Sequence, residues 1–175
     1  MKRTGTTTGF TLVEVSISSA ILGVLAMTAV GILGTAQKGY GSSEVRTTLE
    51  DRTRIALKEI GRELACTGIA CPDWSLSKSE VHYRRAAGYD FAADGLRWDN
   101  IRKFRLSGTK LLFEETSSQG GLVFSRTLLD PVNTFEIAQD PQDPALLTIT
   151  LDLRGTDTQG WTVDVRRTGL VFLRN

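Results

Sequence analysis

A single carboxylate, that of Glu14, stands at the start of a strongly apolar stretch of the sequence. The stretch TGFTLVEVSISSAILGVLAMTAVGILGTA covers residues 8–36, and no charged residue occurs between Glu14 and Lys38. A carboxylate in hydrocarbon costs several kcal/mol unless a cation or hydrogen-bond donors compensate it. The first turn of a helix favours an anion, which offsets part of this cost. Glu14 is therefore a candidate functional residue.

The two cysteines form a second group that could do chemistry. Cys66 and Cys71 are the only cysteines of the chain, in the spacing C-x4-C. Outside a membrane, where disulfides persist, a bridge between them would close a short loop and stabilise the fold by typically about 2–4 kcal/mol. Two free thiols are the alternative. No zinc site is expected, because His82 is the only histidine and there is no second cysteine pair.

The histidine itself gives no basis for catalysis. His82 lies in the segment VHYRR, which contains no nucleophile or carboxylate that would make the imidazole a general base. The patterns GxxxxGK[ST], GxSxG and HExxH do not occur in the chain. We therefore expect no catalytic residue, no cofactor and no enzymatic activity.

Paired arginines occur twice in the second half of the chain, at Arg84-Arg85 and Arg166-Arg167. With Tyr83 and Tyr89 nearby, the first pair could form a basic and aromatic patch for single-stranded nucleic acid. The favoured interpretation is the solvated face of a strand. The 21 Lys and Arg residues nearly balance the 20 Asp and Glu residues, so no strongly basic field exists and no specific nucleic acid is expected.

Three aspartates precede or stand between prolines in the segment DPVNTFEIAQDPQDP: Asp130, Asp140 and Asp143. Their carboxylates could supply oxygen ligands to calcium. Aspartate in loops punctuated by proline is, however, a common turn former, because its side chain binds backbone N–H groups two residues on. Turn formation is the favoured role.

The length of the apolar stretch fits a membrane span. The chain of 175 residues is long enough for one ordinary domain and an appended segment. As a helix, residues 15–36 would be about 33 Å long, which crosses a hydrocarbon core. Lys2 and Arg3 are the only charges before Glu14. Positive flanks stay cytoplasmic, so the residues after Ala36 would lie outside.

Two simple interpretations of this N-terminus leave an observation unexplained. A secretory signal peptide, cut after Gly34-Thr35-Ala36, would have an unusually long apolar run with an acid inside it. A plain membrane anchor leaves the presence of Glu14 unexplained. Under either interpretation the chain would be an exported or membrane-anchored soluble binding domain.

The run Gly9-Phe10-Thr11-Leu12-Val13-Glu14-Val15 resembles the prepilin processing motif of type IV pilins and the pseudopilins of type II secretion. The resemblance implies that a prepilin peptidase and methyltransferase cuts after Gly9 and N-methylates Phe10. It implies that Glu14 is an assembly residue, paired in a filament with the Phe10 amine of a neighbouring subunit. It also implies a bacterial inner-membrane protein with one span, a cytoplasmic N-terminus and a periplasmic domain, which later enters a filament or pilus with other subunits.

The helix is expected to continue beyond the span. Five apolar residues recur at three-, four- and seven-residue steps and predict an amphipathic helix: Leu49, Ala56, Leu57, Ile60 and Leu64. The glycines of GILGTAQKGYG predict a weak middle of the helix, and Gly68 and Pro72 predict its end near residues 66–68. The expected parts are a leader at 1–9, an assembly helix at 10–36, an amphipathic continuation at 37–68 and a β-rich domain at 69–175.

Alternating or β-rich runs separated by turn signals fill the last part of the chain. Strands are predicted at 80–85, 101–106, 110–115, 122–129, 134–138, 146–153 and 161–173. Leu147, Ile149, Leu151 and Leu153 alternate on one side, as do Trp161, Val163 and Val165. We expect an antiparallel sheet with one face on the amphipathic helix, which is an α+β fold and also what a pilin resemblance implies.

A second resemblance is diffuse. The helix segment 53–64, the following Thr67-Gly68 and Cys71, and the ending 171–175 look like PilW-like minor pilins and the J-component pseudopilins. Together the resemblances imply a structural subunit, a minor pilin or a pseudopilin.

Overall fold

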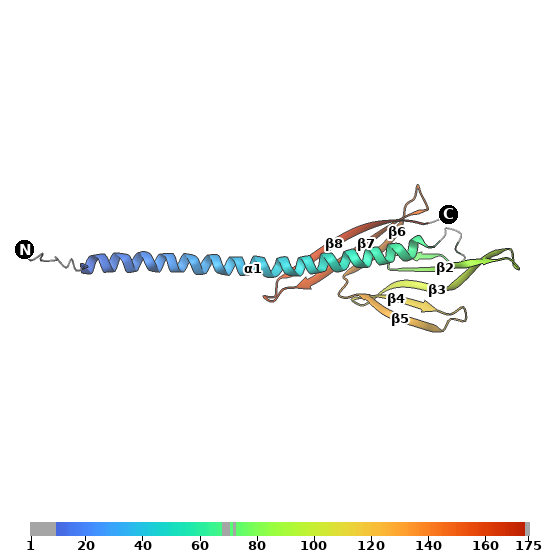
Figure 1. The fold of residues 1–175 in the computed structure, drawn as a ribbon, viewed down its shortest axis with the longest axis horizontal. Coiled ribbons are helices and arrows are strands. Elements are labelled where there is room, and N and C mark those ends of the chain that lie inside the picture. Colours follow the sequence, from blue (N-terminus) through green and yellow to red (C-terminus); the bar gives the residue numbers. More distant parts are fainter. Residues whose placement is uncertain (1–9, 68–70, 72, 174–175) are drawn as a thin grey trace, which may run out of the picture. The chain divides into compact units, whose positions relative to one another are not determined.

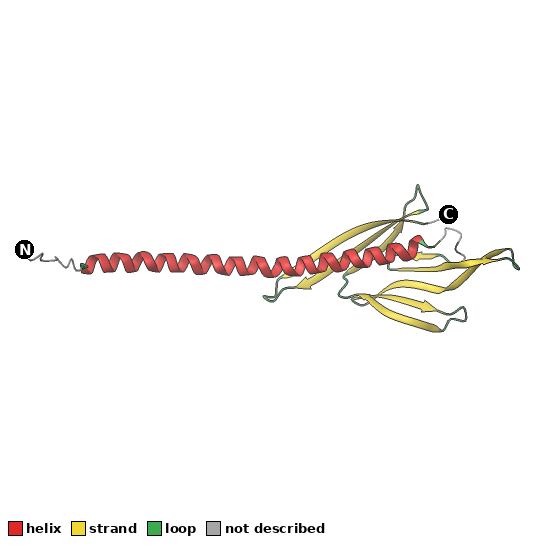
Figure 2. Cartoon of the chain, viewed as in Figure 1, coloured by secondary structure: helices red, strands yellow, loops and turns green. Residues whose placement is uncertain are grey.

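The computed structural model describes residues 10–67, 71 and 73–173. The chain has an α+β fold, in which one long N-terminal helix, α1 (Leu12–Ala65), is followed, among these described residues, by strands and no further helix (Figures 1 and 2). The residues divide into two compact units, 1–41 and 42–175, so α1 contributes to both. The leader proposed at 1–9, including Gly9, lies outside the described residues.

The strands form two antiparallel sheets. Their bounds are β1 (Ser75–Ser77), β2 (Glu80–Asp90), β3 (Gly95–Ser107), β4 (Lys110–Thr116), β5 (Leu122–Leu129), β6 (Thr134–Gln139), β7 (Leu146–Thr156) and β8 (Thr162–Phe172). The first sheet has the order β1-β2-β3-β4-β5 and the second the order β6-β7-β8. Within each sheet every strand therefore pairs with its neighbour in sequence, and the edge strands are β1, β5, β6 and β8.

The helix runs without interruption through the glycine-rich segment. Gly31, Gly34 and Gly39 are all helical, so the weak middle expected from the sequence is not a break in this structure. Each interior glycine costs about 1 kcal/mol relative to alanine, but it still makes the helical backbone hydrogen bonds. The helix ends at Ala65, close to the predicted end, and the next N–H groups, of Cys66 and Thr67, bond to carbonyls three residues back.

The predicted apolar stripe of α1 is confirmed. Leu49, Ala56, Ile60 and Leu64 are buried, and Leu57 is half-buried. Thr53 is also fully buried at the position between Leu49 and Ala56, where its hydroxyl donates to the Leu49 carbonyl at 2.6 Å. Hydropathy alone leaves threonine out of such a stripe, although this local hydrogen bond lets its hydroxyl be buried.

The three-stranded sheet lies close to α1 because glycines face the helix. The predicted inward face of β7 is confirmed, since Leu147, Ile149, Leu151 and Leu153 are all buried. Three glycines mark the closest approach of helix and sheet. A Cβ on Gly155 would lie 3.0 Å from Leu49, one on Gly169 would lie 3.5 Å from Leu57, and one on Gly61 of the helix would lie 3.3 Å from Val171.

The five-stranded sheet brings an aromatic row to the core. The Tyr83 and Phe104 rings stack at 5.7 Å between centroids, and Phe113 lies 5.2 Å beyond Phe104. Polar groups at the margin also tie this sheet to α1: Arg102 donates to Glu63 at 2.9 Å. Both sheets thus share the same helix, which is why the chain needs no second layer of helices.

Three features differ from the sequence-based expectation. The strands split into two sheets rather than one, and the three-residue β1 was not foreseen. The β2–β3 hairpin extends well beyond the predicted strand ends at 85 and 101. Trp161 is not on the buried face with Val165; it is 61% exposed because it closes the β7–β8 turn, where its N–H donates to Asp157.

Candidate functional site

The first turn of α1 is organised by a reciprocal pair of hydrogen bonds between Thr11 and Glu14. The backbone N–H of Thr11 donates to Glu14 Oε2 at 3.1 Å, and the Thr11 hydroxyl donates to the same oxygen at 3.2 Å. In return, the backbone N–H of Glu14 donates to Thr11 Oγ1 at 3.2 Å. This is a capping box, in which each side chain satisfies a backbone donor that the helix start leaves free.

The capping box was missed in the sequence although its signature, Thr-x-x-Glu before an apolar run, is present at residues 11–14. It aims the Glu14 carboxylate back along the chain, toward the residue that precedes the helix. Phe10 lies there, immediately before Thr11, with its side chain 85% exposed. A positive charge on the Phe10 nitrogen would therefore be one residue from a backbone N–H that the carboxylate already binds.

Four hydroxyls in the apolar half of α1 bond to carbonyls of the same helix. Ser16 donates to the Leu12 carbonyl at 2.9 Å, Ser19 to the Val15 carbonyl at 2.8 Å, and Thr28 and Thr35 bond back in the same way. No hydroxyl among these four needs water, which is a condition for a helix in hydrocarbon. Among the described residues, α1 is the one helix long and apolar enough to cross a membrane.

The apolar side chains of this half are exposed in the single chain. They include Val13, Ile17, Leu22, Leu25, Met27, Val30 and Ile32. A monomeric soluble protein rarely exposes a continuous apolar surface of this extent, so lipid or other helices are the expected surroundings.

The two cysteines are free thiols in the structure. Cys66 follows the end of α1 and is half-buried, and Cys71 is buried, where its Sγ accepts the backbone N–H of Arg84 at 3.1 Å. Residues 68–70 and 72, which connect them, are outside the described residues. A Cys66–Cys71 disulfide stays a prediction.

The residues around His82 are engaged with one another. His82 Nε2 lies 2.6 Å from Glu80 Oε1, and Arg84 forms an ion pair with Asp73. Tyr83 points into the core, and burial raises the pKa of its hydroxyl far above the ordinary value, so it is a neutral packing group. The structure therefore does not assemble Tyr83 and Arg84 into an exposed patch for nucleic acid.

The aspartates in the proline-punctuated loops form turns. Asp140 Oδ1 accepts the backbone N–H of Gln142 at 2.7 Å, and Asp143 Oδ1 accepts that of Ala145 at 3.0 Å. Asp130 accepts the hydroxyl of Thr109 at 3.2 Å. Within the described part of the chain, no three metal-ligating side chains converge on one point.

A buried carboxylate on the outer face of the five-stranded sheet was not foreseen. Arg105 donates to both oxygens of Glu114, at 3.0 and 2.9 Å, and Lys103 lies 3.0 Å from Oε2. The Arg105 guanidinium, followed by Lys103, lowers the pKa of Glu114 to about 2. The alternation of the strand indicates which face Glu114 occupies, but the two cations come from the neighbouring strand, whose register the sequence does not reveal.

The chain matches no protein-family model, and neither a curated protein nor a solved structure matches it. What the molecule itself shows is a long apolar N-terminal helix packed, through its second half, against antiparallel sheets, an architecture consistent with that of pilins. The residues at the start of α1 and this fold are therefore the features that bear on function.

Proposed function

We propose that the chain is a structural subunit, a minor pilin or pseudopilin, of a type IV pilus or a type II secretion-like filament. The main support for this proposal comes from the start of α1. There, a lone carboxylate is held beside the Phe10–Thr11 backbone at the head of a span-length apolar helix. A structural rather than a catalytic role follows.

The proposed processing gives Glu14 a counter-charge. Cleavage between Gly9 and Phe10 by a prepilin peptidase would free the Phe10 nitrogen, and N-methylation would leave it able to carry a proton. Because Glu14 already accepts the N–H of Thr11, the new cation would arise next to the carboxylate. An amine so close to an anion lowers the cost of keeping both groups in an apolar environment.

Assembly would then use the same pair between subunits. When apolar helices pack in a filament core, a Glu14 carboxylate without a cation is strongly penalised, so only the axial register that places a neighbour's Phe10 amine beside it is favourable. The exposed apolar side chains of residues 12–33 would form that core.

The proposed location follows from the charges and the span. The subunit would rest in a bacterial inner membrane, with its N-terminus in the cytoplasm and residues beyond 36 in the periplasm, until it is drawn into the filament. There the sheets would face outward and contact other subunits.

The test is a pair of substitutions at Glu14. Glu14→Val should leave cleavage after Gly9 intact and reduce incorporation at least tenfold, because one charge of the pair is lost. Glu14→Gln, which keeps an acceptor for the Thr11 N–H, should fail similarly. Ser16→Ala, two residues along, is the matched control and should incorporate normally. Incorporation is measured as the ratio of the subunit in sheared filaments to that in membranes. Normal incorporation of Glu14→Val would remove Glu14 from its proposed role.

A further inference from the structure

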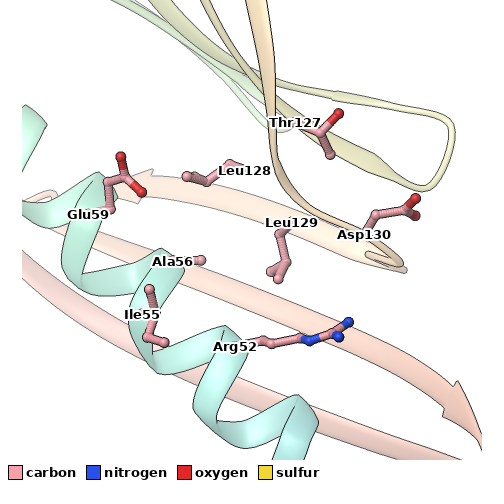
Figure 3. Close-up of a pocket in the computed structure, with 8 residues that line it drawn as sticks. All are labelled: Arg52, Ile55, Ala56, Glu59, Thr127, Leu128, Leu129 and Asp130. Carbon is pink, nitrogen blue, oxygen red and sulfur yellow. The ribbon is translucent and has the colours of Figure 1, made fainter.

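A groove lies between the exposed side of α1 and the edge strand β5. A hollow of about 320 Å³ is bounded by Arg52, Ile55 and Glu59 of the helix and by residues 127–130 at the end of β5 (Figure 3). It continues along the helix past Lys58 and Arg62. This size is at the lower limit of small-molecule pockets, and the hollow is open, which suits a protruding side chain better than an enclosed ligand.

The groove combines an apolar centre with cations that have no partner. Ile55, which lines both hollows, is 63% exposed. Among the described residues, Arg52, Lys58 and Arg62 form no ion pair, whereas Glu59 already pairs with Arg126 of β5. The other acid of the groove, Asp130, accepts a hydrogen bond from Thr109. The groove therefore has an excess of positive charge around an exposed isoleucine.

The tip of the β2–β3 hairpin has the complementary character. Phe91 is 90% exposed, and it stands between Asp90 and Asp94 in a tip, residues 88–96, that contains no cation. The tip is ordered by its own contacts. The Tyr89 ring meets Phe91 edge to face at 5.2 Å, and the Tyr89 hydroxyl bonds to Asp94.

Hydrogen bonds within the turn also hold the tip in one shape. Asp90 Oδ1 accepts the backbone N–H groups of Ala92 at 2.9 Å and of Ala93 at 3.3 Å. A partner would not have to order the loop, so little conformational entropy would be lost on docking.

We propose that the hairpin tip of one copy occupies the groove of a second copy. In that contact Phe91 covers Ile55, and the two tip carboxylates face the free cations of the groove. The tip does not reach the groove of its own chain, because the β2–β3 hairpin projects beyond the end of α1 (Figure 1). Since tip and groove are different surfaces, the contact is head-to-tail and repeats along a row of copies unless the rotation closes a ring.

The proposal uses only residues 52–130 and does not depend on cleavage or on Glu14. It is tested on the full chain in phosphatidylcholine vesicles, with one population of the protein labelled with a heavy isotope. Phe91 is replaced by p-benzoylphenylalanine, and the photo-crosslinked peptides are identified by mass. Crosslinks should join position 91 of one population to residues 52–62 or 127–130 of the other. The same probe at Phe172, an exposed aromatic on β8, should not reach these residues.

Charge variants give the second readout. Asp90→Asn with Asp94→Asn keeps the acceptors that shape the tip and removes its charge, so the crosslink yield should fall by roughly threefold to tenfold. The double substitution Lys58→Glu with Arg62→Glu, which reverses the charge of the groove, should lower the crosslink yield in the same way. Salt at 0.5 M should lower the crosslink yield of the wild type, because it screens the attraction between tip and groove. Glu14→Val should leave the yield unchanged, which separates this contact from filament assembly. No crosslink between copies, crosslinks elsewhere, or a yield indifferent to these charges would overturn the proposal.

Discussion

Replacement of glycine by alanine is expected to have opposite effects on stability at two glycines of the three-stranded sheet. Gly155 and Gly169 both face α1 and neither has a positive φ, so an added methyl group meets no backbone strain at either position. A Cβ on Gly155 would lie 3.0 Å from Leu49 and 3.1 Å from Val45. A Cβ on Gly169 would lie 3.5 Å from Leu57, which is an ordinary contact.

The magnitudes follow from these distances. Replacing glycine by alanine restricts the unfolded chain and stabilises a protein by about 0.4–1 kcal/mol where the fold tolerates the methyl group. At Gly155 the methyl group must displace the buried Leu49 and the β-branched Val45, and overpacking of this kind costs about 1–3 kcal/mol. Gly155→Ala should therefore destabilise the second compact unit, residues 42–175, by about 1 kcal/mol, and Gly169→Ala should stabilise it by up to about 0.5 kcal/mol.

The assay is urea unfolding of the full chain in detergent, followed by the fluorescence of Trp74, Trp98 and Trp161, all of which lie in the second unit. An unchanged slope with a shifted midpoint would show that stability, not compactness, has changed. If Gly155→Ala proved as stable as Gly169→Ala, the close packing of α1 on β7 described above would be incorrect.

Two further changes probe the five-stranded sheet and the start of α1. Glu114→Gln removes a carboxylate whose pKa is about 2 in the folded chain and near 4.5 when unfolded. This lowering of the pKa stabilises the fold by about 3 kcal/mol at most. Solvent screening at the partly exposed Arg105 reduces the stabilisation to about 1.5 kcal/mol. Because the folded state binds the proton less well, this stabilisation is complete above pH 4.5 and is lost as the pH falls toward 2, so the urea midpoints of variant and wild type should differ at pH 7 and converge near pH 2. Thr11→Ala removes the acceptor of the Glu14 N–H and should speed hydrogen exchange of that amide by roughly threefold to tenfold, whereas Ser16→Ala should not; equal exchange in both would show that the capping box does not hold the helix start.

The elements that could be predicted from the sequence are those whose own periodicity shows which face is buried. The helix stripe through Ile60 and Leu64 and the alternation of residues 147–153 each bury one face, so each pattern could be read without knowing its neighbours. The division into two sheets could not be predicted in this way, because the pattern within a strand does not show which strands pair with one another, and the pairing decides where one sheet ends and the next begins. Trp161 was misplaced for a related reason, since the hydrogen bond that its backbone N–H donates to Asp157 in the turn takes it out of the strand pattern.

The candidate site could be predicted in its acid and also, from the Thr-x-x-Glu signature at residues 11–14, in the hydrogen bonds between Thr11 and Glu14. A lone Glu14 at the head of an apolar run is conspicuous in the sequence alone. The tip and groove contributed by Phe91 and Ile55 could not be predicted, because they depend on how the backbone turns and which strand lies at the edge. The disulfide between Cys66 and Cys71 remains a prediction for mass spectrometry under non-reducing conditions.

The central claim is that a cut before Phe10 supplies the cation that Glu14 needs, and the mature N-terminus tests it most directly. Intact mass and N-terminal peptide mapping of the protein isolated from whole native cells should show a chain that begins with N-methylated Phe10 and has lost residues 1–9. A chain that begins at Gln37, as after a conventional signal sequence, or one that keeps its first nine residues, would contradict the account.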